Sequence, residues 1–202
     1  LTKFLPWCVD LEMFDGKPSR ESVKSPFFLA TGKTGRDYQT LIKGADSVEA
    51  ELRIIGPKNQ RISSLPPNVK WLDTTEDPPD QAIDYPTLRE WYAQCIGVCI
   101  PLSGDADDTC GYTNMLEAMA MRKPVLMTRS GCLHIDPESG DFGRLISPKD
   151  SNGWKESMNE LLHNDAKVQE YGMNGRMVAE RDFTIERFDR EVVQFLKDIL
   201  ST

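Results

Sequence analysis

Residues 95–128 read CIGVCIPLSGDADDTCGYTNMLEAMAMRKPVLMT, and their pattern decides the fold. An apolar run at 95–101 is followed by a polar loop at 102–112, a segment with helical spacing at 113–122 and a second apolar run at 124–128. The two runs are apolar throughout rather than alternating, which is typical of strands buried on both faces. A buried strand, a helix and another buried strand predict a parallel pair.

The same alternation continues on both sides of this stretch. Upstream, apolar runs and helical spacings predict strands at 27–31, 51–57 and 69–72 and helices at 36–45 and 87–93. Downstream, they predict a strand at 143–146 and helices near 150–162, 164–180 and 184–200. The sequence therefore predicts an α/β fold: a Rossmann-like parallel sheet with helices on both faces and a helical C-terminal tail. We divide the chain into a lead-in or interlobe segment at 1–26, a Rossmann-like domain at 27–181 and a C-terminal helix at 182–202.

The composition excludes several classes of protein. The 202 residues are 39% hydrophobic, as in globular proteins, and no apolar run approaches the ~18 residues of a membrane-spanning helix. The net charge of −8 argues against binding to nucleic acid, because nothing would offset phosphate repulsion. Five cysteines without a CxxC motif indicate reduced thiols and a cytoplasmic protein. Neither His134 nor His163 belongs to a tight ligand cluster, so we expect no metal site.

The first residues of the sequence lead to a further expectation. The chain starts at Leu1 rather than at a methionine, and no signal-peptide pattern follows. We therefore expect it to be a piece of a longer protein.

The first candidate site is the turn at 31–36, TGKTGR, between a predicted strand and a predicted helix. In an open parallel sheet, ligands bind beyond the carboxyl ends of the strands. Gly32 lets the backbone approach an anion, and Lys33 and Arg36 place positive charges beside a helix N-terminus. A P-loop is excluded because Phe27 stands where that motif needs glycine. A plain turn with solvated bases explains the local sequence equally well.

The second candidate site is the start of the helix predicted at 113–122. Gly111 frees the backbone, we expect Thr113 to be the N-cap, and Glu117 lies in the first turn. A carboxylate facing the crevice can accept hydrogen bonds from two ribose hydroxyls. The local sequence alone favours another interpretation, in which Glu117 stabilises the helix dipole.

The third candidate site is the acidic loop at 103–108. Asp105 and Asp107 form a DxD, which can hold a divalent metal together with a diphosphate. Acidic proteins contain this pattern often by chance, so a solvated turn is the favoured interpretation.

These segments together resemble the retaining nucleotide-sugar glycosyltransferases of the GT-B type, group 1 or family 4. The most specific similarities are PLS at 101–103, LEAMA at 116–120 and KPV at 123–125. Weaker similarities lie at 9–14, 30–37, 52–56, 65–69 and 143–150. The resemblance implies a C-terminal, donor-binding lobe of a two-lobed enzyme, whose acceptor-binding N-terminal lobe the sequence does not include.

The resemblance also implies residue roles. Lys33 and Arg36 would neutralise the donor diphosphate and stabilise the charge that develops on the leaving group. Glu117 would bind the ribose, and Trp71 and Leu72 would lie near the base. The remaining donor contacts would come from Gly32, Gly111, Tyr112 and Thr113. Cations and helix dipole would make a metal unnecessary, so the only small molecule implied is the nucleotide-sugar substrate, with uridine or guanosine as its nucleoside.

Two positions depart from the family pattern. Thr109 stands where the family often has a second acid, and Asp107 or Asp108 could replace it. Arg122 stands in place of the usual glycine before Lys123. Because a positive φ would strain arginine, we expect the helix to end differently there.

Three functions stay open. The resemblance favours transfer of a hexosyl group, in carbohydrate biosynthesis, by a cytoplasmic enzyme that touches a membrane at most through its other lobe. A sugar-nucleotide epimerase or a phosphorylase of the same architecture, or a non-catalytic Rossmann-like binding module, would share the fold. We expect the chain alone to be inactive without the N-terminal lobe.

Overall fold

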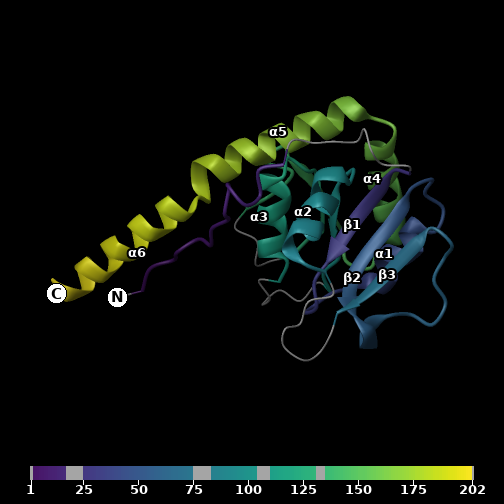
Figure 1. Cartoon of the computed structure of the whole chain (residues 1–202), viewed down its shortest axis with the longest axis horizontal. Helices are drawn as coiled ribbons and strands as arrows, with labels where there is room; N and C mark the ends of the chain where they lie inside the picture. Colours follow the sequence, from purple (N-terminus) through teal and green to yellow (C-terminus); the bar gives the residue numbers. More distant parts are fainter. Residues whose placement is uncertain (1, 17–24, 75–82, 104–109, 131–134, 202) are drawn as a thin grey trace.

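The computed structural model describes residues 2–16, 25–74, 83–103, 110–130 and 135–201. Its strands are β1 (Phe27–Thr31), β2 (Glu51–Pro57), β3 (Val69–Thr74), β4 (Val98–Ile100), β5 (Val125–Thr128) and β6 (Gly143–Ile146). They form one sheet in the order β3-β2-β1-β4-β5-β6, and every pair of neighbours is parallel (Figure 1). The predicted parallel α/β sheet is confirmed.

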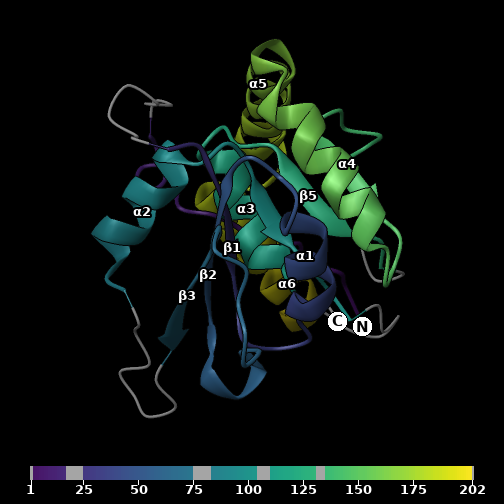
Figure 2. The same ribbon diagram turned by 90° about the vertical axis from the view of Figure 1, so that its right-hand side faces the viewer.

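Helices lie on both faces of this sheet. They are α1 (Tyr38–Ala45), the 3₁₀ turn η1 (Lys58–Gln60), α2 (Tyr85–Gln94), α3 (Tyr112–Ala120), α4 (Ser151–Leu162), α5 (Asp165–Asp182) and α6 (Ile185–Leu200). The helices α1 and α4 cover one face and α2 lies on the other (Figure 2). The strand β1 is apolar throughout because both of its faces are buried. Phe27 and Leu29 pack in the core on one face of the sheet, and Phe28 and Ala30 pack in the core on the other.

The helix N-termini differ in a way that bears on function. An Asp, Asn or Thr side chain caps α1, α2, α4, α5 and α6 by accepting a backbone N–H. The α-helix α3 begins at Gly111 without a side-chain cap. Among the α-helices that the structure describes, α3 is thus the one whose first N–H groups no side chain at the N-cap position satisfies.

One strand is shorter than expected. The strand predicted at 95–101 is reduced to Val98–Ile100, because Cys95 ends α2 as its C-cap and donates its N–H to the carbonyl of Trp91 (3.0 Å). The preceding backbone still pairs with β1, since the N–H of Ile96 donates to the carbonyl of Phe27 (2.8 Å).

The end of α3 contradicts our expectation. Arg122 adopts a φ of 57°, so the position does have the left-handed conformation that usually selects glycine. The N–H of Arg122 donates to the carbonyl of Met119 and that of Lys123 to Ala118, which is a Schellman termination. The Arg122 guanidinium also pairs with Asp15 (2.9 Å), which helps to hold the strained residue.

The lysine of the KPV motif has a structural role. Lys123 is buried, and its Nζ donates to the carbonyls of Ala93 (2.7 Å) and Cys95 (3.0 Å). It thereby satisfies carbonyls at the end of α2 and ties that helix to the start of β5.

The C-terminal helix α6 runs away from the sheet beside the N-terminal segment (Figure 1). The two segments are joined where the N–H of Val9 donates to the carbonyl of Phe183 (2.9 Å). No helix within the described ranges is both long and apolar enough to span a bilayer.

Candidate functional site

The strand order places the candidate site between β1 and β4. The order in which successive strands are added changes direction there, since β2 and β3 lie on one side of β1 and β4 to β6 on the other, although all the strands are parallel. Loops that leave strands at such a switch point diverge and open a crevice. The β1–α1 turn and the segment after β4 meet at this point: the N–H of Asp37 donates to Pro101 (2.8 Å), and that of Ser103 to Gly35 (2.9 Å).

Arg36 is held at this switch point by three hydrogen bonds. Its Nε donates to the carbonyl of Thr31 (3.3 Å), Nη1 to the carbonyl of Thr34 (2.8 Å) and Nη2 to Oδ1 of Asn114 (2.7 Å). The last bond connects the β1–α1 turn to the first turn of α3. For Arg36, the alternative of a base solvated on a plain turn is therefore wrong.

Gly32 makes room for this arginine. It has a φ of 128°, and a Cβ built on it would lie 2.7 Å from Nε and Cζ of Arg36. The guanidinium thus crosses the backbone of Gly32, where any side chain would displace it. Lys33 is exposed in the same turn, and its carbonyl accepts a hydrogen bond from Nε2 of Gln60 (2.9 Å). The role of the Lys33 ammonium stays a prediction.

The helix α3 begins at the same end of the sheet. Gly111 is its N-cap with a φ of 86°, and a Cβ there would lie 2.5 Å from Cγ2 of Ile100 in β4. Thr113 is the second residue of the helix, so our assignment of Thr113 as the N-cap is wrong. The ring of Tyr112 packs edge to face against Phe183, with centroids 6.3 Å apart. These contacts fix the first turn of α3 over the end of the sheet.

Glu117 is the sixth residue of α3 and not, as expected, part of its first turn. Charge–dipole stabilisation falls off within the first turn, so the helix-dipole interpretation loses its basis. The hydroxyl of Tyr92 in α2 donates to Oε2 of Glu117 (2.7 Å). Burial raises the pKa of Glu117, although hydrogen bonds from Tyr92 and Asn114 oppose the shift. Burial and the charge of Glu117 raise the pKa of Tyr92, which keeps its proton for this bond.

The structure thus brings Arg36 and Glu117 together through residues that the sequence did not single out. Asn114 contacts Arg36 and Thr31, and its hydrogen bond to Glu117 opposes the rise in the pKa of that carboxyl group. One signal for Asn114 was available, because residues three apart lie on the same helical face. Tyr92 comes from another helix, and no local pattern could have paired it with Glu117.

Other candidate residues lie further away or outside the described ranges. Trp71 packs against Tyr38 (centroids 4.9 Å apart) and donates from Nε1 to the carbonyl of Gly56 (3.2 Å). Its proposed place near the base is untested. Outside the described ranges lie Asp105, Asp107, Asp108, Thr109, Cys132 and His134. The four described cysteines, Cys8, Cys95, Cys99 and Cys110, are free thiols, as expected.

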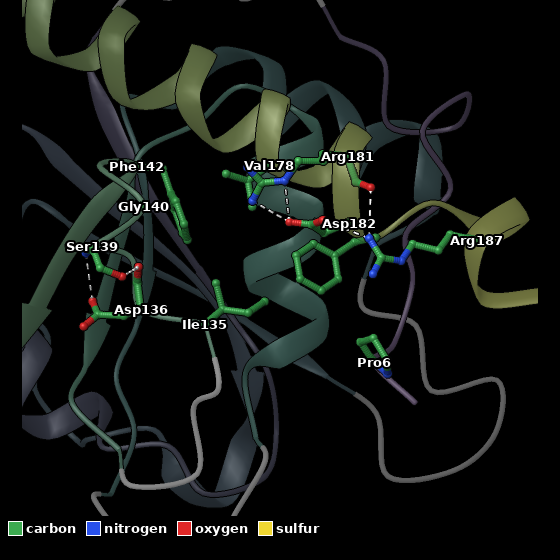
Figure 3. A pocket seen from close by; sticks show the side chains of 11 residues that line it. Pro6, Ile135, Asp136, Ser139, Gly140, Phe142, Val178, Arg181, Asp182 and Arg187 are labelled. Carbon is green, nitrogen blue, oxygen red and sulfur yellow. Dashed lines mark hydrogen bonds and ion pairs between the residues drawn. The ribbon is translucent and has the colours of Figure 1, made fainter. Parts of the chain in front are cut away.

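A separate groove of about 440 Å³ lies between the N-terminal segment, residues 135–142 and the α5–α6 junction (Figure 3). Apolar side chains such as Ile135 and Phe142 line it, and Asp182 pairs with both Arg181 (2.6 Å) and Arg187 (2.9 Å) at its edge. None of the residues predicted to bind the donor lines this groove.

Comparison with known proteins identifies the family. The model of the family described as glycosyl transferases group 1 matches residues 36–164, which is well over half of the chain. The chain belongs to this family. The glycosyl transferase match includes Arg36, Glu117 and α4, and it starts after Gly32 and Lys33. No curated protein matches the chain.

Solved structures agree with this glycosyl transferase fold. Sucrose-phosphate synthase from Thermosynechococcus elongatus is 19% identical, with a TM-score of 0.75 over 98% of this chain and 53% of that one. Anabaena HepE in complex with UDP and glucose is 17% identical, with a TM-score of 0.76 over 98% and 57%. The C-terminal domain of LpcC from Francisella tularensis is 17% identical, with a TM-score of 0.62 over 88% and 99%. The chain therefore spans about half the length of the first two structures.

Proposed function

We propose that this chain is the donor-binding lobe of a glycosyltransferase that moves a hexosyl group from a nucleoside diphosphate sugar to an acceptor, with retention of configuration and without a metal. Arg36 and Lys33 bind the diphosphate, with the backbone N–H groups at the start of α3. Glu117 binds the ribose hydroxyls. A second lobe supplies the acceptor site, and the chain alone does not turn over.

One observation carries this proposal: the Arg36 guanidinium is bonded to Asn114 in the first turn of α3, three residues before Glu117. A cation, a helix N-terminus without a side-chain cap and a half-buried carboxylate therefore lie near one another at this end of the sheet. Breaking a glycosidic bond leaves additional negative charge on the diphosphate, and fixed cations and N–H dipoles stabilise that charge without reorganising. The structural relative HepE was solved with UDP and glucose, which supports a uridine nucleotide as the first ligand to test.

Thermal unfolding with nucleoside diphosphates tests the proposal. A ligand at 100 times its Kd stabilises the folded state by about 2.7 kcal/mol, and each kcal/mol shifts the Tm of a domain of this size by roughly 2–4 °C. We therefore expect UDP, GDP or ADP to raise the Tm by about 5–11 °C, with the parent nucleoside doing less. If none of the three shifts the Tm, the chain is a non-catalytic module of the same fold.

An epimerase with the same architecture would also be stabilised by a nucleoside diphosphate. The whole protein distinguishes the two, because a transferase consumes the nucleotide sugar only when an acceptor is present. Isomerisation of the sugar without an acceptor would favour the epimerase.

A further inference from the structure

We propose that Asn114 is a positioning residue that holds the Arg36 guanidinium in the orientation needed to bind the diphosphate. This inference rests on the proposed function. Asn114 itself need not touch the substrate. It acts through Arg36, and Thr31 fixes Asn114 in turn.

The hydrogen bonds of Asn114 determine its orientation. Arginine has only donors, so the atom that faces Nη2 of Arg36 at 2.7 Å has to be the carbonyl oxygen Oδ1. The amide Nδ2 then points the other way and donates to Oγ1 of Thr31 (2.7 Å). Thr31 is the last residue of β1 and is buried, which gives the amide a rigid anchor in the sheet.

These contacts hold the Arg36 guanidinium through some of its N–H groups and leave the others available. Its bonds to Thr31, Thr34 and Asn114 use three of its five N–H groups, and within the described ranges the other two are left for a ligand. The two backbone carbonyls belong to the end of β1 and to the β1–α1 turn, the segment that carries Arg36 itself, whereas Asn114 belongs to α3. Asn114 is therefore the contact that sets the position of Arg36 relative to the N–H groups of α3, which would bind the same diphosphate.

The geometry also explains why asparagine suits this position. An aspartate would accept from Arg36 but would bring a negative charge next to the diphosphate and Glu117, and it could not donate to Thr31. A leucine would fill the space without forming either bond. Of the common side chains of this length, only a neutral amide both accepts from Arg36 and donates to Thr31 without adding charge.

The test compares a nucleoside diphosphate with its parent nucleoside in the 202-residue chain. The probes are UDP, GDP and ADP against uridine, guanosine and adenosine, with affinities measured by calorimetry or ligand-observed NMR. We expect N114L to bind the preferred diphosphate about tenfold more weakly, the effect of one charge-assisted hydrogen bond, and the nucleoside with a clearly smaller loss, which comes from the bond between Asn114 and the ribose ligand Glu117. T31V, which removes the anchor and leaves Asn114 in place, should lower the same affinity by a smaller factor.

The matched control is N152L, which removes an asparagine from the first turn of α4, where its side chain bonds Glu156 (2.7 Å). It should leave both affinities unchanged. Unchanged diphosphate affinity in N114L, or equal losses for diphosphate and nucleoside, would overturn the inference. If N114L does not fold, unchanged diphosphate affinity in T31V overturns it instead. If the wild type binds no nucleoside diphosphate, the proposed function fails and this inference fails with it; if the wild type binds and the variants match it, only the inference fails.

Discussion

Replacing Arg36 with methionine should weaken the binding of a nucleoside diphosphate by about 100-fold, the largest loss that we expect from any single substitution. The guanidinium is the cation that the fold fixes at the switch point, with two N–H groups directed at no residue in the described ranges. Charge-assisted hydrogen bonds contribute about 1.5–3 kcal/mol each, so losing both costs about two to four orders of magnitude in affinity. Calorimetric titration of the chain measures this directly.

Turnover by the whole protein should fall further than affinity. The diphosphate carries more charge when it leaves than in the bound donor, and removing one donor of this kind typically costs about 10²–10³ in kcat. Arg36→Lys should recover part of the affinity, since it keeps the charge but not the planar fork.

Arg144→Met is the matched control for the arginine substitution, because Arg144 lies in β6 and pairs with Glu160 (3.2 Å). It should bind the nucleotide like the wild type. Equal affinities of the Arg36→Met variant and the Arg144→Met variant would show that the diphosphate binds elsewhere.

Replacing Glu117 with glutamine should separate binding from stability. A carboxylate can accept hydrogen bonds from two ribose hydroxyls, whereas the amide has one acceptor oxygen and presents donors in place of the other. We expect the affinity for the nucleoside diphosphate to fall by about 30-fold, roughly the value of one hydrogen bond to a charged group. The hydroxyl of Tyr92 can still donate to the amide oxygen, so the contact between α2 and α3 is retained.

The shifted pKa of Glu117 also determines in which direction Glu117→Gln changes the Tm. Because the pKa of Glu117 is raised in the folded chain, its favourable contribution is complete below the ordinary pKa of the carboxyl group and is lost as the pH rises through the raised value. At neutral pH the wild type therefore keeps a half-buried carboxylate charged, at a cost in free energy of folding that the neutral glutamine does not have. Glu117→Gln should have a Tm at pH 7 equal to or above that of the wild type, and this difference should shrink towards pH 4.

Glu160→Gln, in α4, serves as the control and should leave nucleotide affinity unchanged. A Glu117→Gln variant that melts earlier but binds the nucleotide normally would mean that Glu117 serves the packing of α3 alone.

The sheet could be predicted because its information is local. Buried strands such as Phe27–Thr31 are continuous apolar runs, and helices such as α1 have apolar residues at helical spacing. The conformation at the end of α3 could not be predicted from the local sequence. Arg122 adopts a conformation that arginine disfavours, because the Schellman bonds and the pairing with Asp15, distant in sequence, outweigh its intrinsic preference.

The candidate site could be predicted in part. Arg36 and Glu117 were found because each follows a strand and a glycine, at the edge where parallel strands bind ligands. Their connection was missed, since it depends on side chains from β1, α2 and α3 that only the folded chain brings within 2.7 Å of their partners. The N-cap of α3 was predicted two residues too late, because Gly111 caps the helix by its left-handed φ and not by a side chain.

The most direct test is a crystal structure of this chain with the nucleoside diphosphate that stabilises it most. We predict that the diphosphate lies between the Arg36 guanidinium and the first turn of α3, with the ribose hydroxyls on the Glu117 carboxylate. A nucleotide bound away from these residues, for example in the groove beside Arg181 and Phe142, would contradict the account.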